Sequence, residues 1–169
     1  FLVAMIERLE ATASLLAAHL NETDAAHLER LAASGLAVAY CPRASAYFHH
    51  DGHRFAAMRA AGVRVALGTD SLLCLDRDDR ISVFDEMRFL AERGARPREL
   101  LTMATIDGAA ALGLDPRLVT LEPGETAGVL AVEVGETAAT LDPWSAVVHA
   151  DVDPFFLVSP LGMDAPASS

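Results

Sequence analysis

The chain has 169 residues, of which 52% are hydrophobic and 22% are charged, and its formal net charge is -11 at pH 7. This hydrophobic content suits one sizeable core and a globular chain rather than a disordered one. The negative charge excludes nucleic acid as an expected partner, because such binding depends on cationic side chains, and it disfavours anionic membrane surfaces as well. No apolar stretch approaches the roughly 20 residues that a membrane-spanning helix requires.

The two cysteines, Cys41 and Cys74, are too few and too far apart for a disulfide framework. Neither belongs to a Cys/His motif typical of a metal site, so both are expected to fill buried space in a cytoplasmic protein. The sequence begins at Phe1, without an initiator methionine, and runs at once into a helical pattern. We therefore expect it to be a fragment of a longer protein.

In chain order, the apolar pattern of the first half predicts alternating helices and strands. The expected helices cover 2–9, 24–35 and 55–62, and the expected strands cover 15–18, 36–40 and 63–67. Their short connections imply right-handed parallel βαβ units. The segment from Arg43 to His53 is predicted to be a loop.

The pattern changes in the second half. Helices are expected at 81–93, 97–105 and 108–113, and a turn at Pro123-Gly124 then precedes two short strands, at 128–134 and 146–149. We predict that these two strands belong to a small β unit apart from the parallel sheet.

Two polar residues stand at the ends of predicted strands. Asp70 follows the apolar run 63–67, and His19 follows the run 15–18. Parallel α/β folds build their active sites at the carboxyl ends of such strands. Both residues are therefore candidates for catalysis, although a helix cap or turn is the alternative for Asp70 and a core histidine is the alternative for His19.

Several segments in a fixed order carry a family likeness. They read AHLN at 18–21, YCPRAS at 40–45, ALGTDS at 66–71, FDEMR at 84–88, LTMATIDGAA at 101–110 and LEPG at 121–124. Together they resemble the amidohydrolase superfamily, in its branch of metal-dependent deaminases and chlorohydrolases of aminated heterocycles. Within that branch, CPRASAYF at 41–48 is most similar to aminofutalosine deaminases and related nucleoside deaminases.

The resemblance implies an α/β fold, a (β/α)8 TIM barrel flanked by a small β-sandwich. Residues 1–120 would form the C-terminal part of the barrel, with strands six to eight, residues 121–158 part of the sandwich, and residues 159–169 a disordered tail. The family's His-x-His pair of strand one and the histidine and glutamate of strand five are absent. A barrel needs about 200 residues or more, so we expect this chain alone to be inactive.

The resemblance also implies roles for particular residues. Asp70 would ligate a divalent metal and accept a proton from the metal-bound water, while His19 would contact that water or the substrate, or ligate the metal in two-metal members. Arg43, Ser45 and Ser71 are the predicted substrate contacts, since an arginine can clamp a carboxylate or sugar hydroxyls. Zinc is the expected metal, with iron as the alternative.

Two polar clusters are predicted to lie outside the site. His49, His50 and His53 have a metal-like spacing but no helical register, so we expect surface or lid residues. The acidic run at 76–79 lacks the glycine and the distal glutamate of a calcium-binding EF-hand and is predicted to be a solvated loop. At Tyr40 the chain departs from many members of the family, which carry His before Cys-Pro.

The resulting hypothesis is a metal-dependent hydrolase of C–N bonds that deaminates an aminated purine nucleoside or a related heterocycle. One alternative is a non-catalytic truncated half-barrel, whose open sheet edge would invite pairing with another chain. A second alternative is a two-metal cyclic amidohydrolase. The expected partner is a small-molecule substrate. Neither nucleic acid nor a membrane is expected as a partner, and the question of whether the protein forms a homo-oligomer stays open.

Overall fold

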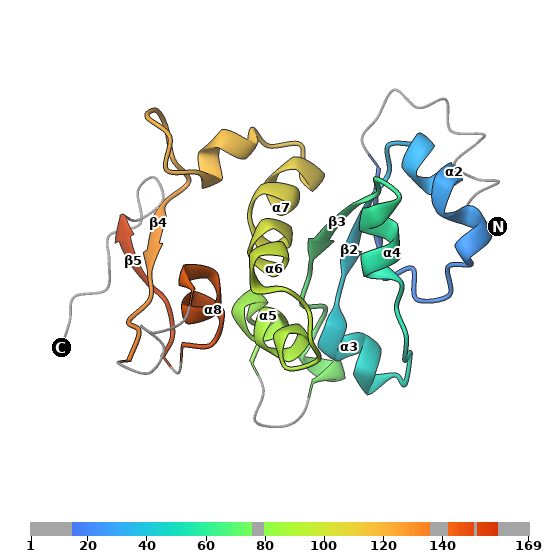
Figure 1. Cartoon of the computed structure of the whole chain (residues 1–169), viewed down its shortest axis with the longest axis horizontal. Coiled ribbons are helices and arrows are strands. Elements are labelled where there is room, and N and C mark those ends of the chain that lie inside the picture. Colours follow the sequence, from blue (N-terminus) through green and yellow to red (C-terminus); the bar gives the residue numbers. More distant parts are fainter. Residues whose placement is uncertain (1–14, 76–79, 136–141, 151, 159–169) are drawn as a thin grey trace.

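The computed structural model, which describes residues 15–75, 80–135, 142–150 and 152–158, is built around a three-stranded parallel sheet (Figure 1). The strands follow the order β1 (Leu16–Ala18), β2 (Ala37–Tyr40) and β3 (Arg64–Leu67). Ala18 is paired with Ala39, which is paired in turn with Ala66. All three strands end at the same edge of the sheet, which confirms the predicted parallel arrangement.

Helical segments connect these strands. Between β1 and β2 lie η1 (Ala25–His27) and α2 (Leu28–Ala33), and Asp24 caps them by accepting a hydrogen bond from the Ala26 N–H group at 3.1 Å. Between β2 and β3 lie α3 (Pro42–Tyr47) and α4 (Phe55–Ala60).

The predicted loop from Arg43 to His53 is wrong in its first part, because α3 begins directly after β2. Pro42 stands in the first turn of this helix, where a missing N–H group costs nothing and the fixed φ of proline suits the helix.

Three helices follow the sheet and cover it. They are η2 (Leu72–Cys74) leading to α5 (Val83–Ala91), then α6 (Pro97–Ala104) and α7 (Ile106–Ala111). Figure 1 shows α5, α6 and α7 in the middle of the molecule, and each of them contacts β3. The predicted helices of this region are therefore confirmed: α5 and α6 are shorter than expected, and α7 begins two residues earlier.

One hydrophobic core joins the sheet to its helices. Val38 and Val65 of the sheet are fully buried, as are Met58 of α4, Met103 of α6 and Val148 of α8. Since α8 (Pro143–Val148) contributes to the same core, the C-terminal part of the chain packs against the part that carries the parallel sheet.

The C-terminal region differs from the prediction. After η3 (Pro116–Val119), strand β4 (Val129–Ala131) lies within the predicted 128–134, and it pairs antiparallel with β5 (Phe155–Val158) in a separate sheet. The predicted strand at 146–149 is wrong, because this segment lies largely in α8. Asp142 accepts hydrogen bonds from the N–H groups of Trp144 and Ser145, and Pro143 follows it, which together start a helix.

Three expectations lie outside the described residues: the helix at 2–9, the loop at 76–79 and the tail at 159–169. Among the helices that the structure describes, none has the length and apolar character needed to cross a membrane.

Candidate functional site

The candidate site lies at the carboxyl edge of the parallel sheet. His19 directly follows β1, and Asp70 follows β3 after Gly68 and Thr69. The distance from His19 Nε2 to Asp70 Oδ2 is 3.5 Å, and their side chains are 39% and 31% exposed. The structure thus brings together two residues that are far apart in the sequence and leaves both of them open to solvent.

The backbone at both residues is strained. His19 has a φ of 65° and Asp70 a φ of 58°, and Leu20 next to His19 has a φ of 57°. This left-handed region costs a residue other than glycine on the order of 1–3 kcal/mol, and such strain is found where function requires it. Leucine has no polar side chain to compensate, so the turn at His19 must be held by contacts from elsewhere.

Hydrogen bonds hold this turn, and one of them is made to β2. The His19 N–H group donates to the Ala39 carbonyl at 2.8 Å, and the Leu20 N–H group donates to the Ala18 carbonyl at 3.0 Å. The latter bond closes a γ-turn with His19 at its centre. The His53 Nε2 atom lies 2.7 Å from the His19 carbonyl oxygen.

Ser45 supports the same turn from α3. Its hydroxyl group donates to Asn21 Oδ1 at 2.8 Å, and the residue is only 2% exposed. Ser71, by contrast, is exposed and lies next to Asp70, with its hydroxyl oxygen 3.9 Å from the Cys74 sulfur. The predicted role of both serines as substrate contacts stays a prediction.

Arg43, the third predicted substrate contact, binds a buried glutamate. Its Nε atom donates to Glu86 Oε1 at 2.8 Å, and its backbone N–H group donates to Glu86 Oε2 at 2.9 Å. A further guanidinium N–H group donates to the Arg80 carbonyl at 2.8 Å. Its role in substrate binding stays a prediction, while the contact itself fixes the start of α3 to α5.

Glu86 was not among the site residues predicted from the sequence. It is fully buried on α5, and burial raises the pKa of its carboxyl group, although the hydrogen bonds from Arg43 oppose this shift. A signal was present, since Glu86 lies one helical turn before the buried Leu90 and next to the buried Met87. A carboxylate on the apolar face of a helix needs a cationic partner.

The two cysteines are buried and free, as predicted. Burial, followed by the negative charge of Asp70, raises the pKa of the Cys41 thiol to about 12. A thiol that stays protonated at neutral pH is a poor nucleophile. Cys41 therefore contributes to packing beside the site, where it contacts the strand end that leads to Asp70.

The histidine cluster divides into two kinds of residue. His49 and His50 are exposed, as predicted, and His50 Nδ1 lies 3.3 Å from a carboxylate oxygen of Glu22. His53 differs from the prediction, because it stacks on Tyr40 with ring centroids 3.8 Å apart. Burial lowers the pKa of His53, so the neutral imidazole is favoured.

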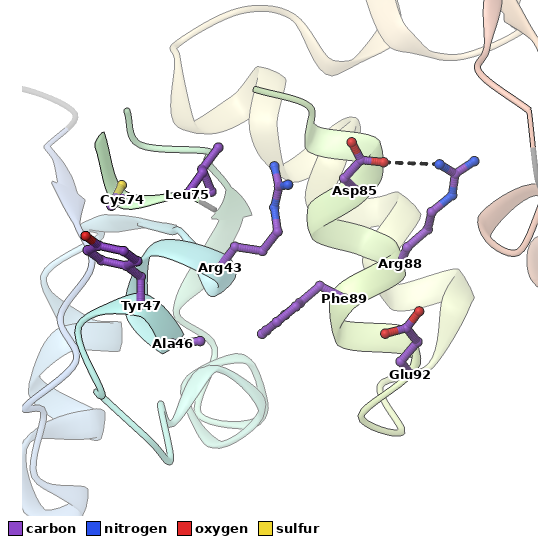
Figure 2. Close-up of a pocket in the computed structure, with 9 residues that line it drawn as sticks. All are labelled: Arg43, Ala46, Tyr47, Cys74, Leu75, Asp85, Arg88, Phe89 and Glu92. Atoms are coloured by element: carbon purple, nitrogen blue, oxygen red, sulfur yellow. Dashed lines mark hydrogen bonds and ion pairs between the residues drawn. The ribbon is translucent and has the colours of Figure 1, made fainter. Parts of the chain in front are cut away.

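A cavity of about 440 Å³ lies beside the candidate site rather than in it. Figure 2 shows Phe89 of α5 pointing across it toward Ala46 of α3, whereas the Arg43 side chain points away from Phe89. Neither His19 nor Asp70 lines this cavity. It therefore gives no support to the placement of a substrate.

The residues of the candidate site suit a metal only as part of a ligand set. Within the described part of the chain, no three His, Cys, Asp or Glu side chains form a group that could hold a metal ion. The imidazole of His19 and the carboxylate of Asp70 are both donor types that zinc accepts, and they lie close together. They therefore fit as two ligands of a larger set.

Curated relatives share the sequence pattern of this chain. The 5-methylthioadenosine/S-adenosylhomocysteine deaminases of Teredinibacter turnerae and Halobacterium salinarum are 34% and 38% identical to it over 125 residues. Each match covers 69% of this chain and 28% of the relative. The aminodeoxyfutalosine deaminase of Deinococcus radiodurans is 35% identical over 101 residues, which cover 59% of this chain and 23% of the relative. The chain thus spans less than a third of the length of these relatives.

Solved structures share the fold. An adenosine deaminase from Xanthomonas campestris with bound zinc superimposes with a TM-score of 0.75 at 25% identity, covering 96% of this chain and 42% of that one. An atrazine chlorohydrolase from Arthrobacter aurescens, complexed with zinc and atraton, gives a TM-score of 0.71 at 21% identity, over 88% of this chain and 38% of that one. The family model described as "Amidohydrolase family" matches residues 6–159. With the strand-end pair of His19 and Asp70, this match shows that the chain belongs to the amidohydrolase family.

Proposed function

We propose that this chain is the C-terminal part of a zinc-dependent hydrolytic deaminase that acts on an aminated purine nucleoside or a related heterocycle. The observation that carries this proposal is the pair of His19 and Asp70, 3.5 Å apart at the carboxyl edge of a parallel sheet. Relatives named as deaminases of methylthioadenosine, guanine and aminodeoxyfutalosine support the reaction type. The zinc in the solved adenosine deaminase supports a divalent metal, for which we propose zinc.

In this proposal β1, β2 and β3 are strands six, seven and eight of a (β/α)8 barrel. Their parallel order and the helices that follow them support this assignment. Residues 1–120 then belong to the barrel, and residues 121–158 to the small β-sandwich, of which β4 and β5 form the paired part. Ligands to the metal other than Asp70 would come from barrel strands outside this chain.

The chain's own groups have separate tasks in the reaction. A bound zinc ion supplies Lewis acidity and lowers the pKa of water toward neutrality. The Asp70 carboxylate accepts a proton at Oδ2 and delivers it to the departing amino group, as a general base and then a general acid. His19 Nε2, which faces Asp70 Oδ2, orients the attacking oxygen by a hydrogen bond. A cytoplasmic location and a homo-oligomer stay predictions.

The test measures metal content and ammonia release in the purified longer protein of which this chain would be the C-terminal part. We expect about one zinc per active chain, as a one-metal site requires, and release of ammonia from one of adenosine, methylthioadenosine, guanine or aminodeoxyfutalosine. A metal-free protein without activity on any of these substrates would favour the non-catalytic half-barrel instead. Release of a carboxylic acid from a cyclic amide would favour the two-metal alternative.

The Asp70→Asn variant tests the role of the carboxylate. Since the amide cannot accept a proton, we expect kcat to fall by at least about 100-fold. The matched control is Asp51→Asn, an exposed aspartate in the loop after α3, which should keep the wild-type rate. Wild-type turnover by Asp70→Asn would contradict the assignment.

A further inference from the structure

We propose that His53 is a positioning residue for His19, acting through the hydrogen bond between its Nε2–H group and the His19 carbonyl oxygen. The proposal deepens the function proposed above and rests on it for its consequences in catalysis. The contact of 2.7 Å itself is a feature of the fold and can be tested separately.

The backbone conformation of His19 needs support from its surroundings. It stands at the centre of a γ-turn with a positive φ of 65°, followed by Leu20 with a φ of 57°. Two successive residues of this kind relax toward ordinary backbone angles unless other contacts hold them. A rotation of this peptide would turn the imidazole away from Asp70.

Both polar backbone groups of His19 are held by hydrogen bonds. Its N–H group donates to Ala39 of β2, and its carbonyl oxygen lies at the His53 ring. A carbonyl oxygen can only accept, so His53 must carry its proton on Nε2. The bond therefore selects one tautomer of the neutral imidazole.

Packing alone does not explain why a histidine stands at position 53. The ring of His53 stacks on Tyr40 at an interplanar angle of 11° and lies next to Phe55. A phenylalanine would stack equally well and would avoid a penalty, because His53 Nδ1 is buried without a hydrogen-bond partner in the described structure. Within the described residues, the ring's polar contact is directed at the His19 carbonyl oxygen.

The His53→Phe variant separates packing from positioning, because it keeps the aromatic stack and removes the donor. We expect an unfolding midpoint equal to or above that of the wild type. Where the wild type is active, we expect kcat to fall about ten-fold, as is typical for residues that orient a ligand, with little change in KM. The matched control is His50→Phe in the same loop, which should leave kcat unchanged.

Two measurements by NMR do not depend on activity. In the unmodified protein, the ring nitrogen shifts of His53 should show the Nε2–H tautomer. In His53→Phe, the amide nitrogen of Leu20 should shift, since it belongs to the peptide group whose carbonyl loses a hydrogen bond. The His50→Phe control should leave this resonance in place.

Each contrary result overturns the proposal. An Nδ1–H tautomer in the wild type would exclude donation to His19, and an unchanged Leu20 resonance in His53→Phe would show that the contact does not shape the turn. Wild-type kcat in a stable His53→Phe variant would show that the contact does not serve catalysis. If the wild type releases no ammonia from any nucleoside, the proposed function fails, while the NMR measurements still decide the role of His53.

Discussion

Gly68 shows how closely the strand end that carries Asp70 is packed. A Cβ atom at this position would lie 3.0 Å from Cys41 Sγ and 3.7 Å from Ala39 Cβ. The Gly68 N–H group donates to the Tyr40 carbonyl at 2.8 Å, so the backbone cannot easily move away. Glycine is required at this position because there is too little room for a side chain next to the neighbouring strand.

We therefore expect Gly68→Ala to lower the free energy of unfolding by about 1–3 kcal/mol, as is typical of overpacking. Truncation of Cys41 to alanine in the same chain should recover most of this loss, because it removes the sulfur that the new methyl group meets. Urea unfolding of the two single variants and the double variant gives the coupling between them. The control is Gly135→Ala, where a Cβ atom meets nothing within 4 Å; equal losses at both glycines would refute the packing argument.

At the scale of elements, the contact between α3 and α5 depends on one buried ion pair. Glu86 is fully buried, and the Arg43 side chain is 9% exposed. The carboxylate also accepts the backbone N–H group of Arg43, in the first turn of α3. The helix that starts directly after β2 is thus fixed to the helix that follows β3, and α3 carries Ser45 toward the His19 turn.

The Glu86→Gln variant should lower the free energy of unfolding by about 3 kcal/mol, because the guanidinium of Arg43 would lose its buried counter-charge. Glu99→Gln on α6 is the matched control: its partner Arg96 is largely exposed, and such a surface pair contributes on the order of 0.5 kcal/mol. Thermal and urea unfolding measure both variants. A Glu86→Gln variant as stable as Glu99→Gln would show that the buried pair does not stabilise the contact.

At the scale of the whole molecule, charged contacts join α5 to the segment before β5. Arg80 binds both Asp85 and Asp153, and Arg88 donates to the Val152 carbonyl at 3.0 Å. The hydrogen bonds from Arg80 are the largest cause that lowers the pKa of Asp85 below its ordinary value of 3.8. These contacts hold the C-terminal region against the part that carries the site.

This arrangement predicts a loss of stability in acid. Because the pKa of Asp85 is lower in the folded state, the unfolded chain takes up a proton first as the pH falls. The stabilisation is complete above the unfolded pKa of 3.8 and is lost as the pH falls through the folded pKa. The unfolding midpoint of the wild type should therefore drop below about pH 4.

The Asp85→Asn variant tests this contribution. Measured between neutral pH and pH 2, its unfolding midpoint should depend less steeply on pH below about pH 4 than that of the wild type. Asp51→Asn, in an exposed loop, should retain the wild-type slope. The same slope in Asp85→Asn as in the wild type would assign the acid sensitivity to other carboxyl groups.

Local sequence patterns predicted the parallel strands and the two residues at their ends. The strand that precedes His19 or Asp70 can be predicted from a short apolar run in the sequence, because strand formation and the position of a strand end depend on neighbouring residues. The strand predicted at 146–149 was wrong for a related reason. Its apolar residues suit either a strand or a buried helix. The N-cap at Asp142, followed by Pro143 in the first turn, favours the helix.

The sequence by itself therefore determined the class of fold, the family and the pair of His19 and Asp70 as candidates. Only the tertiary structure decided that Glu86 holds Arg43, that Ser45 reaches Asn21, and that His53 holds the backbone of His19. The physical reason is the range of the interactions. Periodicity and caps act within a few residues, whereas these contacts join residues more than 20 positions apart and form only when the strands lie side by side.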